Sequence, residues 1–145
     1  MKTILSTLIL SFVLITGNAQ KMSVSNISQK ENSTVFNYVV LTKKVDQLEP
    51  IILAAAHLVK ENEREFGNFE VIVCGADIVS LTDEKKMEQF LKRADEYKVQ
   101  ILACGFSLKK FEVDPNKIPD NVKVVENGIL YNIELQKKGY LSLEL

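Results

Sequence analysis

Cysteine and histidine are scarce in this 145-residue chain, which has two cysteines and one histidine. These are too few for a tetrahedral Cys/His zinc site within one chain, and too few for a disulfide-rich scaffold. Neither sign of charge is in clear excess, because 18 Lys and Arg oppose 19 Asp and Glu, for a formal net charge of -1. A protein that binds a nucleic-acid backbone needs a basic surface. We therefore expect no metal site, no resident cofactor and no nucleic-acid partner.

The rest of the composition is that of an ordinary folded protein. Hydrophobic residues make up 46% of the chain, charged residues 26% and aromatic residues 8%. These proportions argue against a disordered, collagen-like or polytopic membrane protein. A chain of this length corresponds to one domain.

Long apolar runs are also rare, and the N-terminal one has the pattern of an export signal. Lys2 precedes an apolar run over residues 4–15, and Gly17-Asn18-Ala19 follows it. The run is about 12 residues long, shorter than the roughly 20 that a membrane-spanning helix needs. We predict a signal peptide over residues 1–19, cleaved after Ala19, a flexible leader over 20–33 and a folded domain over 34–145. The protein is then secreted across the inner membrane, is expected in the periplasm, and has no membrane association after cleavage.

Beyond the leader, short β-branched and aromatic runs alternate with segments of helical periodicity, which is typical of an α/β protein with a mainly parallel sheet. The first helix is predicted to end near Gly67, and the second to begin with Thr82 as its N-cap. A short third segment follows from Ser107, and a fourth helix begins at Asn127-Gly128. The five predicted strands cover residues 35–41, 69–74, 99–104, 122–125 and 141–145. The second and third are almost continuously apolar, as expected of central strands that helices cover on both faces.

Two of the predicted strands end in the same dipeptide, Cys74-Gly75 and Cys104-Gly105. Ligands of open parallel sheets bind at the carboxyl ends of the strands, so both thiols are expected at the functional edge. The glycine after each cysteine permits a tight turn or a close approach of another group.

Cys104 is the stronger candidate because it leads directly into a predicted helix with Ser107 as its N-cap. Free N–H groups and the positive end of the helix dipole would stabilise a thiolate and lower the pKa from about 8.5. The alternative is that Cys104 is a small buried hydrophobic residue, as free cysteine often is. Spacing alone leaves both interpretations open.

The region from Val35 to Leu145 resembles the DsrE/DsrF-like family of sulfur-relay proteins. The resemblance is carried by the run Ile101-Leu102-Ala103-Cys104-Gly105-Phe106-Ser107-Leu108, followed by Ile118, the segment 122–125, Gly128-Ile129 and Gly139-Tyr140. It implies a three-layer α/β/α fold with a mainly parallel five-stranded sheet and assembly as a homo-oligomer. It also implies that Cys104 carries a persulfide and passes sulfane sulfur between donor and acceptor thiol proteins or small thiols.

The resemblance has departures that keep other functions open. Many similar proteins have His-Gly where this chain has Cys74-Gly75, and the export signal differs from cytoplasmic sulfur-trafficking members. If the second and third strands are neighbours, Cys74 and Cys104 approach the separation of a disulfide. The alternatives to a sulfur carrier are therefore a dithiol redox protein using both cysteines, and a non-catalytic oligomeric binding module of the same fold.

Overall fold

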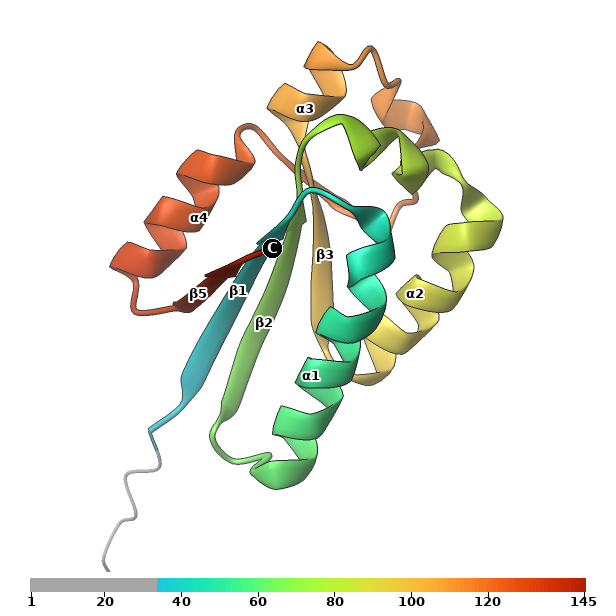
Figure 1. Ribbon diagram of the computed structural model, residues 1–145. Helices are drawn as coiled ribbons and strands as arrows, with labels where there is room; N and C mark the ends of the chain where they lie inside the picture. The colour runs from blue at the N-terminus through green and yellow to red at the C-terminus, as the bar shows by residue number, and fades with distance from the viewer. Residues whose placement is uncertain (1–33) are drawn as a thin grey trace, which may run out of the picture. The chain divides into compact units, whose positions relative to one another are not determined.

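The computed structural model describes residues 34–145, so the predicted signal peptide and leader lie outside the described residues (Figure 1). It contains one five-stranded sheet in the order β4-β3-β2-β1-β5. Every neighbouring pair of strands is parallel. The strands are β1 (Phe36–Thr42), β2 (Phe66–Val73), β3 (Val99–Cys104), β4 (Lys123–Val125) and β5 (Leu141–Glu144).

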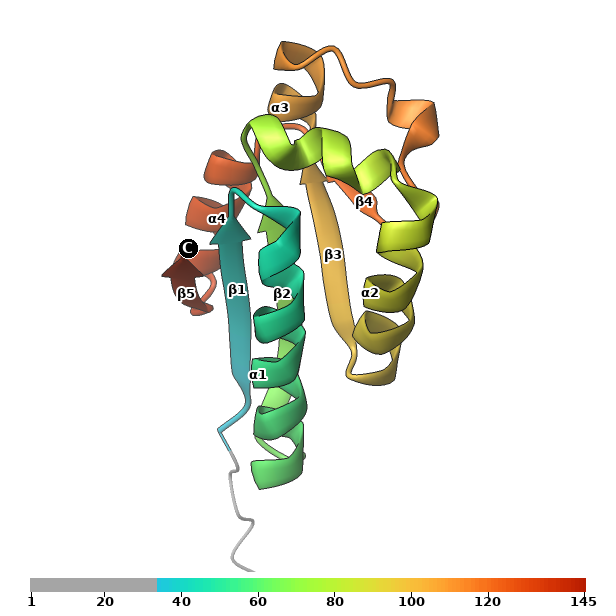
Figure 2. The ribbon, with the colours of Figure 1, turned by 45° about the vertical axis from the view of Figure 1, so that its right-hand side comes forward.

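Helices cover both faces of this sheet. The α-helices are α1 (Leu48–Glu61), α2 (Glu84–Glu96), α3 (Gly105–Lys110) and α4 (Gly128–Lys137). Helices α1 and α2 lie on one face and α4 on the other, while α3 lies beyond the carboxyl end of β3 (Figures 1 and 2). Short 3-10 helices cover Val45–Gln47, Ala76–Thr82 and Pro115–Lys117. The prediction of a three-layer α/β/α domain with a parallel sheet is confirmed.

The central strands form the core because helices shield both of their faces. Residues 71–73 of β2 are fully buried, and residues 101–103 of β3 are almost fully buried. Such continuous burial explains why these two strands are uninterrupted apolar runs rather than alternating ones.

The winding of the chain reverses after β4. Strands β1 to β4 are laid down side by side in one direction, and β5 then returns to the far side of β1. To make this return, the chain crosses to the opposite face as α4 (Figure 2). Consequently the start of α4 lies over the ends of β2 and β3, where the two cysteines are.

The boundaries predicted at Gly67 and Thr82 are wrong. Helix α1 ends at Glu61, and Gly67 lies inside β2, where a Cβ would come within 2.5 Å of Asn37 Oδ1. The glycine therefore allows a close approach to β1 and does not stop a helix. The N-cap of α2 is Asp83, whose carboxylate accepts a hydrogen bond from Lys86 N at 3.0 Å, and Thr82 ends the preceding 3-10 helix. A carboxylate is a stronger acceptor at the positive end of a helix.

Candidate dithiol site

Cys74 and Cys104 lie next to each other at the carboxyl edge of the sheet. Strands β2 and β3 are paired with Val73 opposite Ala103, so the following residues, Cys74 and Cys104, are neighbours. Both cysteines are free. Both are also buried, with exposed fractions of 7% for Cys74 and 3% for Cys104. The structure thus brings together the two thiols that the sequence placed at separate strand ends.

Gly128, the first residue of α4, covers both sulfur atoms. Its backbone N–H donates a hydrogen bond to Cys104 Sγ at 3.2 Å. Asn127 caps the same helix through its side chain, which accepts from Ile129 N and Leu130 N, so the Gly128 N–H is left for the sulfur. A Cβ at position 128 would lie 2.6 Å from Cys74 Sγ and 3.2 Å from Cys104 Cβ. Only glycine lets the helix start this close to the thiols.

Ser107 joins the two strand ends from the other side. The prediction that it is the N-cap of α3 is wrong, because the N-cap is Cys104 and the helix begins at Gly105. Ser107 lies in the first turn, where its Oγ accepts a hydrogen bond from Gly75 N at 3.0 Å and its hydroxyl interacts with the Cys104 sulfur. A series of hydrogen bonds therefore links the Gly75 N–H to the Ser107 hydroxyl, and the Ser107 hydroxyl to the Cys104 sulfur.

The two glycines that follow the cysteines have different surroundings. Gly75 has a φ of +79°, in the left-handed region that favours glycine, and this turn directs its N–H toward Ser107. Gly105 packs against the end of β4, where a Cβ would lie 2.9 Å from the Val125 carbonyl oxygen. Gly105 therefore lets the start of α3 approach the end of β4.

The surroundings lower the pKa of Cys104. Burial by itself would raise the pKa, because it penalises the charged thiolate. The hydroxyl of Ser107, the backbone N–H groups of Gly128 and Ser107, and the Cys74 thiol together outweigh burial, so the pKa of Cys104 lies below its ordinary value of 9.0. Cys104 is the thiol that ionises first.

Cys74 has the opposite property. Burial first, and then the charge and hydrogen bond of Cys104, raise the pKa of Cys74 from 9.0 to about 12. The interaction between the two sulfur atoms adds to both shifts, but burial is the largest cause for Cys74, and Ser107 and Gly128 contribute more than Cys74 to the lowered pKa of Cys104. The two thiols of the pair are therefore unequal in acidity.

This asymmetry predicts an alkaline loss of stability that depends on Cys74. The folded protein binds the Cys74 proton more tightly than the unfolded chain, so the resulting stabilisation is complete below pH 9.0 and is lost as the pH rises toward about 12. Urea unfolding from about pH 8 to about pH 11 should show wild type approaching the Cys74→Ser variant as the pH rises. Parallel pH profiles for the two proteins would contradict the assignment.

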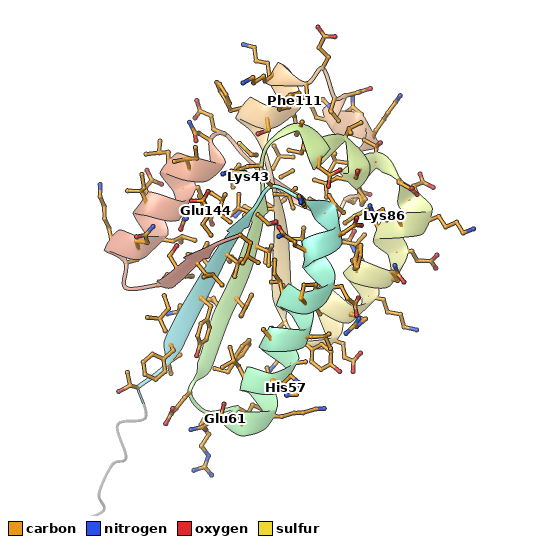
Figure 3. The ribbon with its side chains drawn as sticks, in the orientation of Figure 1. Lys43, His57, Glu61, Lys86, Phe111 and Glu144 are labelled. Atoms are coloured by element: carbon orange, nitrogen blue, oxygen red, sulfur yellow. The ribbon has the colours of Figure 1, made fainter. Side chains whose placement is uncertain are left out.

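Sequence reasoning missed three contributors to this edge. Gly128 was recognised as a helix start but not as a cover for the thiols. Lys43 and Glu144, which form an ion pair at 2.8 Å, extend the same edge (Figure 3). The one histidine of the chain, His57, is exposed on α1, far from Lys43 (Figure 3). The sequence shows that Lys43 and Glu144 lie at the ends of predicted strands. It does not show that these two strands are neighbours, which is what brings the two side chains together.

Residues 34–145 contain neither a candidate metal centre nor a candidate membrane-spanning helix. In that region no group of three or more His, Cys, Asp or Glu side chains is arranged to hold a metal ion. No helix of the described domain has the length and apolar character needed to cross a bilayer. An apolar groove of about 280 Å³ lies between α1 and β5, on the face opposite α4; among its lining residues are Tyr38, Pro50, Ala54, Leu58, Leu141 and Leu143.

Comparisons with known proteins identify the fold and no family. No family model matches the chain. No curated protein matches it either. Among solved structures, it is similar to MTH1491, a protein of unknown function from Methanobacterium thermoautotrophicum, with a TM-score of 0.61 and 15% identity over 76% of this chain and 99% of that one. It is also similar to BT1422, a conserved protein of unknown function from Bacteroides thetaiotaomicron, with a TM-score of 0.54 and 17% identity over 75% of this chain and 95% of that one.

Proposed function

We propose that this protein is an exported sulfane-sulfur carrier of the DsrE/DsrF type, which holds a persulfide on Cys104. The observation that carries the proposal is the hydrogen bond from Gly128 N to Cys104 Sγ beside a second, protonated thiol. A buried cysteine with no donor would be a plain core residue. Here the donors lower the pKa of Cys104, and thiolate is the nucleophilic form of cysteine.

The loading step is a thiol exchange. The Cys104 thiolate attacks the outer sulfur of a donor persulfide, R–S–SH. The Cys104 Sγ–S bond forms as the donor S–S bond breaks, and the donor leaves as the thiolate R–S⁻. Oxidation states are only redistributed between sulfur atoms, so no external oxidant is required.

Unloading reverses the exchange with an acceptor thiolate. The acceptor takes the outer sulfur as R′–S–SH, and Cys104 leaves as a thiolate. A more stable leaving thiolate makes this step faster, and the groups that lower the pKa of Cys104 supply that stability. Cys74 contributes its S–H hydrogen bond to the sulfur that carries the charge.

The direct test is sulfur loading of the purified protein. After treatment with a small persulfide, intact mass spectrometry should show the gain of one sulfur atom in wild type and in Cys74→Ser. The gain should be absent in Cys104→Ser. Equal loading of Cys104→Ser and wild type would refute the proposal.

A dithiol redox protein is the second candidate, and the register of the two free cysteines favours it. Neighbouring thiols on paired strands can close to a disulfide if the dihedral strain is small. Mild oxidation would then remove two hydrogen atoms from the mass of the intact protein. The sulfur carrier should instead keep both thiols free under those conditions and gain sulfur only from a sulfane donor.

A binding module without turnover is the third candidate, favoured by the 3% exposure of Cys104. Such a module should resist alkylation until it is unfolded, whereas the carrier should react at Cys104 in the native state. We further propose that the mature protein is periplasmic and homo-oligomeric. Cell fractionation and light scattering of the purified protein test these two points.

A further inference from the structure

The carboxyl edge of the sheet places a cation beside Cys74, the member of the thiol pair nearer to β1. Lys43 follows β1 by one residue, and β1 is paired with β2. Cys74 N donates a hydrogen bond to Thr42 O at 2.8 Å, so the residue after Thr42 is held against the Cys74 turn. A Cβ at Gly75 would lie 3.6 Å from the Lys43 Cβ and Cγ atoms.

The alternation of the strands puts the charged residues on the same face as the thiols. Leu41 pairs with Ile72 and with Glu144, and side chains two residues apart share a face. Lys43, Cys74 and Glu144 therefore face the side that α4 covers. Along the edge the order is Glu144, Lys43, Cys74, Cys104; each is the last residue of its strand or directly follows it, and the four strands are adjacent.

The Lys43 head group is available to an incoming ligand. Its only ion pair in the described domain is with Glu144 at 2.8 Å, and the two side chains are 64% and 60% exposed. Figure 3 shows the two side chains meeting at the end of the sheet. Exposed ion pairs of this kind contribute little stability, so an anion in solution can replace Glu144 at small cost.

We propose that Lys43 is an anion-recognition residue of the dithiol site, and that the site takes sulfane-sulfur donors bearing an anionic group next to the sulfane sulfur. Thiosulfate is the simplest such donor. This inference rests on the proposed function, and it names the substrate class of the same site. Glu144 forms an ion pair with Lys43 and releases it when the donor binds.

With thiosulfate the step is balanced without further reactants. The Cys104 thiolate attacks the sulfane sulfur, the Cys104 Sγ–S bond forms, and the S–S bond of thiosulfate breaks. Sulfite leaves with the electron pair of the broken bond, and Cys104 becomes a persulfide anion. Lys43 binds the sulfonate group, which becomes the leaving sulfite.

The first experiment measures thiosulfate loading in charge variants. Lys43→Met should load roughly tenfold more slowly than wild type, since a hydrogen bond to a charged group contributes at least that much. Glu144→Gln should load faster than wild type, because Lys43 is then free. Lys43→Arg should resemble wild type. Lys44→Met is the matched control, since it removes the same charge one residue away and should load as wild type does.

The second experiment separates charge recognition from sulfur transfer. Iodoacetate and iodoacetamide alkylate a thiolate by the same displacement of iodide, but only iodoacetate is an anion. The rate of Cys104 alkylation by iodoacetate, divided by the rate with iodoacetamide, is measured by peptide mapping. This ratio should fall in Lys43→Met and stay constant in Lys44→Met.

Each outcome of the pair of experiments decides something. An unchanged rate ratio and unchanged thiosulfate loading in Lys43→Met would overturn the inference and leave the sulfur carrier intact. Equal slowing with both alkylating reagents would show a structural role for Lys43 and also overturn it. A wild-type protein that keeps the charge preference but takes no sulfur from thiosulfate or a persulfide would refute the proposed function and the sulfane-sulfur substrate class, and would leave only anion recognition by Lys43.

Discussion

Replacing Gly128 with alanine should lower the free energy of unfolding by about 1–3 kcal/mol, the usual cost of forcing an extra methyl into a packed core. The new Cβ would lie 2.6 Å from Cys74 Sγ and 2.7 Å from Ile72 Cγ2. Both contacts are far shorter than van der Waals distance, so the start of α4 must move away. Moving it lengthens the hydrogen bond from Gly128 N to Cys104 Sγ, and native-state alkylation of Cys104 at neutral pH should slow as its pKa rises.

The sign of the stability change makes this prediction sharp. Alanine is a better helix former than glycine by about 1 kcal/mol, so helix propensity alone predicts that the variant is more stable. Ile129→Ala, at the next position of the helix, is the matched control, because Ile129 is 62% exposed. Urea unfolding of the three proteins gives the comparison. A stabilised Gly128→Ala variant would mean that α4 does not press on the cysteines.

Replacing Ser107 with alanine should have the second largest effect, and it should be visible as a pH shift. The hydroxyl lowers the pKa of Cys104, so its loss should move the pH midpoint of Cys104 alkylation upward. The same change deprives the Gly75 N–H of its acceptor. An unsatisfied buried donor costs about 1–3 kcal/mol of unfolding free energy, and Gly75 is half-buried, so we expect a loss near the lower end, about 1 kcal/mol.

Ser107→Thr serves as the control, because it keeps the hydroxyl and should return the pH midpoint toward that of wild type. A purely structural role for Ser107 predicts a loss of stability without any shift of the alkylation midpoint. The pH profile measured below the unfolding transition therefore distinguishes an electrostatic role from a packing role.

The elements of the fold were largely predictable because their signals are local. Continuous apolar runs marked β2 and β3, and Asn127 before Gly128 marked the start of α4. Boundaries were less predictable where two local signals compete. Glycine often ends a helix, but Gly67 lies within β2. Thr82 is a possible N-cap, but it lies beside the stronger capping residue Asp83. In each case a tertiary contact or a charge decided the boundary.

The candidate site was predictable only in part. The repeated Cys-Gly step pointed to the carboxyl edge of the sheet, since parallel strands end at the same side. That Cys74 and Cys104 are partners required β2 and β3 to be adjacent, which is a property of strand order. That one thiol is acidic and the other is not depended on Gly128, Ser107 and burial together.

By itself, the sequence determined the α/β class, most of the strands and the two strand-end thiols, because apolar periodicity and turn residues act over a few neighbours along the chain. The tertiary structure alone decided that α4 returns across the sheet, that Gly128 covers both sulfur atoms and that Lys43 meets Glu144 beside Cys74. These contacts join residues that are 24 to 101 positions apart. Pairing over such separations follows from how whole elements pack, and no local pattern encodes it.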